Sequence, residues 1–227
     1  MNLSAQQRRL IERVINVFET GSADGDYGMI AIFADGPHDI RQITYGRSQT
    51  TEYGNLRLLV ADYVASSGSF SAALAPYADL VGSTPLTNDS EFKRLLRSAG
   101  RQDSVMQRAQ DKFFERVYFA PAKRWCETEG FVSALAVLVT YDSFIHSGSM
   151  LWSIRSQFAE MTPVNGGDER AWIKAYVTAR HAWLKSHRRE AVRLSAYRTK
   201  DLLREVSRAN WDLAIEPITA NGTQVRS

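Results

Sequence analysis

Glu19 and Asp39 are the residues of this chain whose types and spacing suit acid–base chemistry. Glu19 stands at the C-terminal edge of a predicted helix, and Asp39 opens the β-prone stretch DIRQITYGR at residues 39–47. A connector and a hairpin lie between them, so the two carboxylates could face each other across a groove. Such a pair suits glycoside hydrolysis, in which one carboxylic acid protonates the leaving oxygen and the other carboxylate activates water. Spacing alone favours two solvated surface acids, because exposed carboxylates are the common case.

A predicted helix positions Glu19. Ser4 and Gln7 have the spacing of a capping box, and Gly21 is suited to end the helix. Between these signals, apolar residues recur at helical intervals, namely Leu10, Ile11, Val14, Ile15 and Phe18. Glu19 therefore falls in the last turn.

A β-hairpin is expected to position Asp39. Residues 27–34 have the pattern of a strand, residues 35–39 that of its turn, and residues 40–47 that of the return strand. No other part of the sequence gives a convincing β prediction.

The rest of the chain is predicted to be helical. Periodic apolar residues and helix-stop signals mark the segments 55–68, 89–100, 102–120, 130–148, 168–187 and 198–210. The helix at 102–120 is expected to stop near Pro121. The stretch 131–145 is apolar on nearly all sides but shorter than 18 residues, which favours a buried central helix over a membrane span.

The composition is that of a globular protein with one domain or two closely joined lobes. Hydrophobic side chains make up 44% and charged ones 23% of the chain, with a net charge of +3. The first residues lack the apolar core of an ordinary secretory signal, so the compartment stays open. The single cysteine, Cys126, cannot form an intrachain disulfide, and neither it nor the histidines have metal-ligand spacing. We therefore expect no metal and no organic cofactor.

Three short motifs favour a catalytic role for Glu19 and Asp39 over two surface acids. FET at 18–20, DYG at 26–28 and DIRQITYGR at 39–47 resemble the catalytic lobe of the glycoside hydrolase family 46 chitosanases, where a helix-end Glu precedes YG and then DGRGxTFGR. The resemblance implies that Glu19 is the general acid, Asp39 the general base, and Thr44 a residue that holds the attacking water.

The resemblance also implies a fold. It predicts that residues 1–227 form a single catalytic domain of two lobes, in a mainly α-helical, lysozyme-like α+β fold with a substrate groove between the two helical lobes. One small antiparallel β-hairpin sheet and a long buried central helix that links the lobes complete this expectation.

Further matches follow in the same order along the chain. TYDSFIHSG at 140–148, TARHAW at 178–183 and SAYRTKD at 195–201 resemble family motifs on the central helix and beyond it. By resemblance, a buried ion network that positions the catalytic acid falls on four residues: Asp142, Arg180, Glu190 and Arg198. The alternative is a set of structural ion pairs, and for Glu190 a surface position is about equally expected.

Two departures from the family pattern matter. The turn is longer than the family's, which makes Asp35 a rival for the base, although Asp39 alone keeps the five-residue step to Thr44. Asn55 stands where the family carries an Asp that binds a protonated glucosamine. Losing that charge-assisted hydrogen bond costs roughly 1.5 to 3 kcal/mol of recognition. Alternatively, Asn55 caps the following helix.

Other candidate residues surround the proposed groove. Tyr27, Tyr45 and Tyr53 offer aromatic faces for a sugar ring, although packing is the default role of each, and Arg41 is a further candidate for substrate binding. The five tryptophans are mostly core candidates by helical spacing.

The predicted function is endo-hydrolysis of a β-1,4-linked amino-sugar polymer, chitosan, with inversion. Nine Lys or Arg against three acidic residues in 180–208 favour an anionic polymer instead, so a muramidase-like peptidoglycan hydrolase is the first alternative. A non-catalytic polysaccharide-binding module is the second. We expect a monomer that binds no nucleic acid and no membrane, since the basic stretch carries no nucleic-acid-binding motif.

Overall fold

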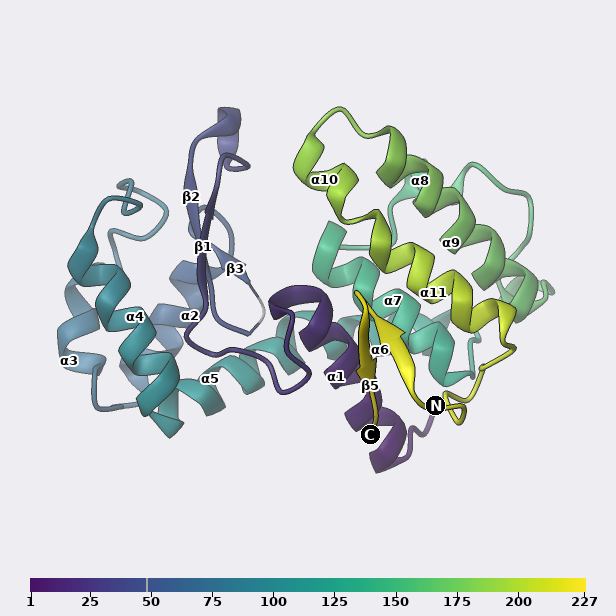
Figure 1. The fold of residues 1–227 in the computed structure, drawn as a ribbon, viewed down its shortest axis with the longest axis horizontal. Coiled ribbons are helices and arrows are strands. Elements are labelled where there is room, and N and C mark those ends of the chain that lie inside the picture. The colour runs from purple at the N-terminus through teal and green to yellow at the C-terminus, as the bar shows by residue number, and fades with distance from the viewer. Residues whose placement is uncertain (48) are drawn as a thin grey trace. The chain divides into compact units, whose positions relative to one another are not determined.

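The computed structural model describes residues 1–47 and 49–227, which divide into two compact units. The first unit contains Met1–Ala23 and Arg116–Ser227, and the second contains Asp24–Glu115. Helices dominate both units, and the strands are short (Figure 1). The predicted mainly helical fold with a small antiparallel sheet is therefore confirmed.

The first helix, α1, spans Ala5–Thr20. The capping box predicted at its start is present, because the Ser4 hydroxyl accepts from the Gln7 backbone N–H and Gln7 Oε1 accepts from the Ser4 backbone N–H. The helix ends at Gly21, whose φ of 75° lies in the left-handed region that glycine adopts readily. The predicted apolar residues are buried, which places Glu19 in the last turn.

Helix α7, Ala134–Ser147, forms the centre of the first unit, and residues 134–143 are buried without interruption. Its nearly uniform apolar sequence suits this position, because α1, α6 and α9 pack against it. The expectation that this helix links two lobes is wrong, since it lies wholly within the first unit. Further helices of the unit are α6 (Ala120–Thr128), α8 (Trp152–Arg155), α9 (Glu169–Ser186), α10 (Glu190–Leu194) and α11 (Ala196–Ser207).

The chain passes from the second unit to the first through a π-helical turn, Glu115–Phe119, which leads into α6. The expected helix stop near Pro121 is wrong. Pro121 lies in the first turn of α6, where its missing N–H would have no partner within the helix anyway.

A second hairpin, which the sequence prediction did not include, follows α11. Its strands are β4, Ile218–Ala220, and β5, Thr223–Val225. Strands of three residues are too short to display an alternating pattern. The signal that could have found them is the Asn221–Gly222 pair, a two-residue turn with φ values of 45° and 82°.

The second unit holds the three-stranded antiparallel sheet in the order β1-β2-β3. The predicted hairpin is its main part: Ile30 pairs with Tyr45 and Phe33 with Gln42. Its elements are β1 (Ile30–Phe33), β2 (Gln42–Tyr45), β3 (Thr50–Thr51), α2 (Leu56–Ala65), α3 (Ser71–Leu74), α4 (Ser90–Gln102) and α5 (Ser104–Phe114). All of β2 is buried, so this strand anchors the loop that carries Asp39.

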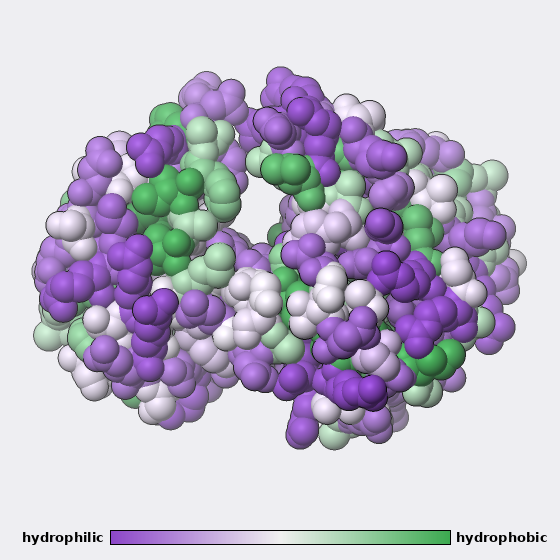
Figure 2. All heavy atoms as spheres, viewed as in Figure 1, coloured by the Kyte–Doolittle hydropathy of each residue, from purple (hydrophilic) through white to green (hydrophobic). Residues whose placement is uncertain are grey.

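The visible surface is mostly hydrophilic, with hydrophobic side chains in small groups on both units (Figure 2). Within the described residues, no helix is both long and apolar enough to cross a membrane.

Candidate active site

The end of α1 holds Glu19 with its side chain only 7% exposed. Arg198 Nη2 donates to Glu19 Oε1 at 2.6 Å and to the Phe18 carbonyl at 3.0 Å. The Tyr197 hydroxyl donates to the same carbonyl at 2.8 Å. Because the last carbonyls of a helix lack partners inside it, two consecutive residues of α11 complete the end of α1. They thereby fix the position of the Glu19 carboxyl group.

Asp142 of α7 is fully buried and binds two guanidinium groups at once. Arg198 Nη1 donates to its Oδ1 at 2.8 Å, and Arg180 Nη1 donates to its Oδ2 at 2.5 Å. We call Glu19, Asp142, Arg180 and Arg198 the Glu19 cluster. A buried charge without a partner costs several kcal/mol, and these contacts remove that cost from Asp142 and both arginines.

The surroundings of the Glu19 cluster shift the pKa values of its two carboxyl groups in opposite directions. Burial raises the pKa of Glu19, and the charge of Asp142 adds to this, although Arg198 acts in the opposite direction. Burial would also raise the pKa of Asp142, but the charges of Arg180 and Arg198 outweigh it and lower that pKa to about 2. At neutral pH the cluster therefore combines a fixed anion at Asp142 with a carboxyl at Glu19 that retains its proton more strongly than usual.

His146 is a neighbour of this cluster to which the sequence analysis gave no role. Burial and the charges of Arg198 and Arg180 lower the pKa of His146 to about 3. The imidazole is therefore neutral at ordinary pH and adds no charge to the site. Its position four residues after Asp142 on α7 is the signal that could have placed it on the same helix face.

Glu190 does not belong to the ion network in which it was predicted to lie. It is exposed in the first turn of α10, and in the described part of the chain it makes neither a hydrogen bond nor an ion pair. An acid in the first turn of a helix is favoured by the helix dipole, which is reason enough for a glutamate there.

Asp39 is exposed on the loop that joins β1 to β2. The Gly36 N–H donates to the Ile40 carbonyl at 3.0 Å, and the Asp39 N–H donates to the Gly36 carbonyl at 3.0 Å. His38 and Asp39 have φ values of 55° and 59°, in the left-handed region. That conformation costs a non-glycine residue roughly 1 to 2 kcal/mol. A strained and internally hydrogen-bonded loop thus presents the Asp39 carboxylate to solvent.

Asp35, the other candidate for the general base, is hydrogen-bonded within the same loop, near its junction with the strands. Its Oδ1 accepts a hydrogen bond from Gln42 Nε2 at 2.8 Å, and Gln42 Oε1 accepts one from the Tyr53 backbone N–H at 3.2 Å. A Cβ added at Gly36 would lie 2.8 Å from the Ile40 carbonyl oxygen, so only glycine fits there. These contacts give Asp35 a structural role and favour Asp39 as the base.

Thr44 is buried in β2, opposite Ala31 of β1 and Thr51 of β3. Its hydroxyl lies 3.2 Å from the Ala31 carbonyl and 3.1 Å from Gln49 Oε1. A hydroxyl donates one hydrogen bond, so one of these oxygens receives it while the hydroxyl oxygen can still accept from water.

The prediction that Tyr45 binds the substrate is also wrong. It is fully buried, and its hydroxyl donates to the Leu96 carbonyl at 2.7 Å. Burial raises the pKa of this phenol. Tyr45 and Thr44 point to opposite faces of the sheet, and both side chains are buried because both faces of β2 are covered. Its ring belongs to the core of the second unit and offers no face to a sugar.

The other candidates for substrate binding lie in the second unit. Tyr27 is half-buried, and its hydroxyl donates to Asp111 Oδ1 at 2.9 Å. Arg41 is exposed at the start of the return strand. Asn55 occupies the N-cap position of α2 but makes no side-chain capping hydrogen bond, so the alternative that it caps this helix is wrong.

Among residues 1–47 and 49–227, no group of three His, Cys, Asp or Glu side chains is arranged to hold a metal ion. Cys126 is buried, and its pKa is raised to about 12 by burial, so its thiol is inert at ordinary pH.

Comparisons with known proteins identify the family of the chain. The model of Glycosyl hydrolase family 46 matches residues 13–218. A chitosanase from Bacillus subtilis is 27% identical over 225 residues, which cover 92% of this chain and 79% of that protein. A chitosanase from a Streptomyces species is 28% identical over 171 residues, which cover 72% of this chain and 56% of that protein, little more than half its length.

A solved structure shares the fold. It is a mutant chitosanase from Bacillus subtilis complexed with 6 GlcN, with a TM-score of 0.84, 24% identity and 100% of both chains covered. Because the family model spans most of the sequence, the chain belongs to glycosyl hydrolase family 46 and is a glycoside hydrolase.

Proposed function

We propose that this enzyme hydrolyses chitosan, cutting β-1,4 linkages between amino-sugar units inside the polymer with inversion at the anomeric carbon. Two sequence relatives of this chain are named as chitosanases. The observation that carries the proposal is the buried Glu19 carboxyl, which Arg198 holds and whose pKa burial raises.

Glu19 is the proposed general acid. It donates its proton to the glycosidic oxygen as the bond from that oxygen to the anomeric carbon breaks. The carboxylate that results keeps its 2.6 Å contact with Arg198, now as a charge-assisted hydrogen bond. Asp142 shares the charge of Arg198, which prevents the arginine from drawing the proton off Glu19 too early.

Asp39 is the proposed general base. Its exposed carboxylate accepts a proton from water while the water oxygen attacks the anomeric carbon from the face opposite the leaving group. Thr44 is proposed to hold this water through its hydroxyl oxygen. After the two sugar products leave, Asp39 releases its proton to solvent and Glu19 takes one up from solvent, which restores the starting state.

Asn55 is proposed to weaken the preference for a fully deacetylated chain. A neutral amide replaces the carboxylate that the family pattern places there, at a cost of roughly 1.5 to 3 kcal/mol for an ammonium group. Tyr27 and Arg41 remain the proposed substrate-binding residues of the second unit. This neutral position is the reason to test peptidoglycan as a second substrate.

The test is reducing-end release from partly acetylated chitosan and from purified peptidoglycan. Glu19→Gln and Asp39→Asn are each expected to lower chitosan turnover at least a hundredfold, while Glu190→Gln, an exposed acid outside the cluster, leaves it unchanged. Loss of turnover in Asp35→Asn but not in Asp39→Asn would instead identify Asp35 as the base. Viscosity loss ahead of reducing ends reports internal cutting, and the first anomer formed, seen by NMR, reports inversion. Turnover of peptidoglycan alone would overturn the choice of substrate.

A further inference from the structure

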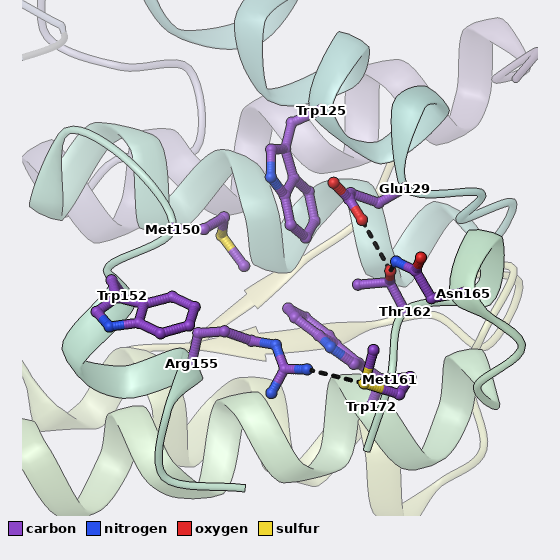
Figure 3. Close-up of a pocket in the computed structure, with 9 residues that line it drawn as sticks. All are labelled: Trp125, Glu129, Met150, Trp152, Arg155, Met161, Thr162, Asn165 and Trp172. Atoms are coloured by element: carbon purple, nitrogen blue, oxygen red, sulfur yellow. Dashed lines mark hydrogen bonds between the residues drawn. The ribbon is translucent and has the colours of Figure 1, made fainter. Parts of the chain in front are cut away.

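A pocket of the first unit lies outside the Glu19 cluster and has no part in the proposed reaction (Figure 3). It has a volume of about 270 Å³, close to the lower end of the range for small-ligand sites. Its walls come from the end of α6, the segment that follows α7, and the first turn of α9. A cavity of this size admits a single sugar unit.

Three indoles shape the pocket. Trp172 is fully buried and stacks on Tyr176, with ring centres 5.2 Å apart and planes within 7°. Trp125 stacks on Phe131 at 5.4 Å, so both rings are held firmly by the core. Trp152, in contrast, is 78% exposed at the pocket, which is not what core spacing predicted. An indole left in water beside a fixed aromatic wall suits stacking against the apolar C–H faces of a pyranose ring.

Glu129 supplies a carboxylate to one end of the pocket. Asn165 Nδ2 donates to Thr162 Oγ1 at 2.8 Å, and Thr162 Oγ1 donates to Glu129 Oε2 at 2.7 Å. This relay fixes the direction of the carboxylate. Its other oxygen, Oε1, has no hydrogen bond or ion pair within the described residues, so it is available to a cationic ligand.

Arg155 lies across the pocket from Glu129 (Figure 3). Its Nη1 donates to the Phe158 carbonyl at 2.8 Å and its Nη2 to Met161 Sδ at 3.9 Å, and the guanidinium group lies 6.0 Å from the Trp172 ring centre (Figure 3). The remaining N–H groups of Arg155 can donate to ligand oxygens. The buried Trp172 Nε1 likewise has no hydrogen-bond partner among residues 1–47 and 49–227. The pocket thus offers an anion at one end and hydrogen-bond donors at the other.

We infer that this pocket binds one glucosamine unit of a chitosan chain, as a second carbohydrate site separate from the catalytic residues. The ammonium group faces Glu129 Oε1, the sugar hydroxyl oxygens accept from Arg155, and Trp152 covers one apolar face of the ring. The charges decide the orientation, because Arg155 would repel an ammonium group at its own end. The inference rests on the proposed chitosanase function for its choice of ligand.

A second site changes how the enzyme meets a polymer. One chain that occupies the pocket remains tethered, so the local concentration of its other units near the enzyme rises without any change in the catalytic residues. A short soluble oligosaccharide gains nothing from such tethering. The pocket is therefore expected to matter for polymer or particulate chitosan alone.

The test compares Trp152→Ala and Glu129→Gln with the wild type. Adsorption to insoluble chitosan, measured at low and high salt with each variant also carrying Glu19→Gln, is expected to weaken about tenfold for either change. Val132→Ala, which removes a 75% exposed side chain outside the pocket, is the control and should adsorb normally. Salt should weaken wild-type adsorption more than that of Glu129→Gln, because the latter lacks the charge. Turnover of a short glucosamine oligosaccharide should be unchanged in the active proteins.

Several outcomes would overturn the inference. Normal adsorption of Trp152→Ala would show that the pocket does not bind chitosan. A fall in oligosaccharide turnover that parallels the loss of adsorption would show that the substitution disturbs the catalytic residues as well. Adsorption to fully acetylated chitin that depends equally on Glu129 would refute the role of the ammonium group. If the wild type adsorbs through Trp152 but cuts no chitosan, the proposed function fails while this site stands.

Discussion

Asp142→Asn is the substitution that most directly tests how the first unit prepares Glu19. The change keeps the shape of a fully buried side chain and removes one negative charge. Arg198 then has Glu19 as its remaining carboxylate partner in the Glu19 cluster. An ionised Glu19 becomes more favourable, so the pKa of its carboxyl must fall relative to the wild type.

The size of this effect follows from the shared guanidinium group. Two contacts of 2.8 and 2.6 Å to different nitrogens of Arg198 hold the two carboxylates. Charge centres so placed are on the order of 6 Å apart, and at an effective dielectric constant of about 20 they interact by about 3 kcal/mol. That energy corresponds to roughly a hundredfold change in the proton affinity of Glu19. The loss of a buried partner also costs roughly 3 to 5 kcal/mol of folding free energy.

The assay is the pH dependence of kcat on a soluble glucosamine oligosaccharide, with thermal unfolding measured alongside. The alkaline limb, where the acid loses its proton, is expected to move to lower pH in Asp142→Asn. Asp201→Asn is the matched control, because Asp201 is also buried and pairs with Arg204 outside the cluster. It should lose stability without moving the limb. An unmoved limb in Asp142→Asn, with activity lowered equally at every pH, would refute the electrostatic role and leave a structural one.

Three further predictions follow from the same contacts. Glu19→Gln should be more stable than the wild type at neutral and alkaline pH, because the raised pKa of Glu19 means that its ionisation costs the wild type stability as pH rises above 4.5. A difference in urea midpoint between the two proteins that is the same at pH 4 and pH 8 would contradict this. Tyr45→Phe should cost about 1 kcal/mol of unfolding free energy through the lost bond to the Leu96 carbonyl and leave KM unchanged, whereas a raised KM would return Tyr45 to the substrate site. Gly36→Ala should lower kcat roughly ten- to hundredfold, because the new methyl group forces the Ile40 carbonyl away and displaces the Asp39 loop. Unchanged activity in steady-state kinetics would show that the loop tolerates the methyl group.

Local signals predicted the helical part of the fold well. The capping box at Ser4, the stop at Gly21 and the apolar period between them defined α1 to within a residue. The errors arose where local and tertiary preferences differ. Pro121 is a helix stop in isolation but an acceptable first-turn residue in α6. The C-terminal hairpin consists of strands too short for periodicity, so only its Asn-Gly turn carried a signal.

Some residues of the candidate site were placed correctly from the sequence and others were not. The resemblance to family motifs placed Asp142, Arg180 and Arg198 in one network with Glu19, and in the structure these four residues are joined by ion pairs. Glu190 was misplaced since it lies in α10, a five-residue helix with little periodic constraint. Tyr45 was misplaced for a different reason: every residue of β2 is buried, and the cover over the faces of a strand depends on elements elsewhere in the chain.

The charge balance of the Glu19 cluster explains why a buried acid can both hold and release a proton. Arg180 and Arg198 contribute two positive charges, and Asp142 cancels one. With Glu19 protonated, the cluster carries one excess positive charge in a buried site, which favours ionisation of Glu19. Burial of the carboxyl opposes that ionisation, and the raised pKa means that burial prevails in the resting enzyme. Once the proton passes to a leaving oxygen, the new carboxylate neutralises the excess charge through a contact with Arg198 that already exists. The cluster thus needs no rearrangement at the moment of proton transfer, which is the condition for effective electrostatic stabilisation.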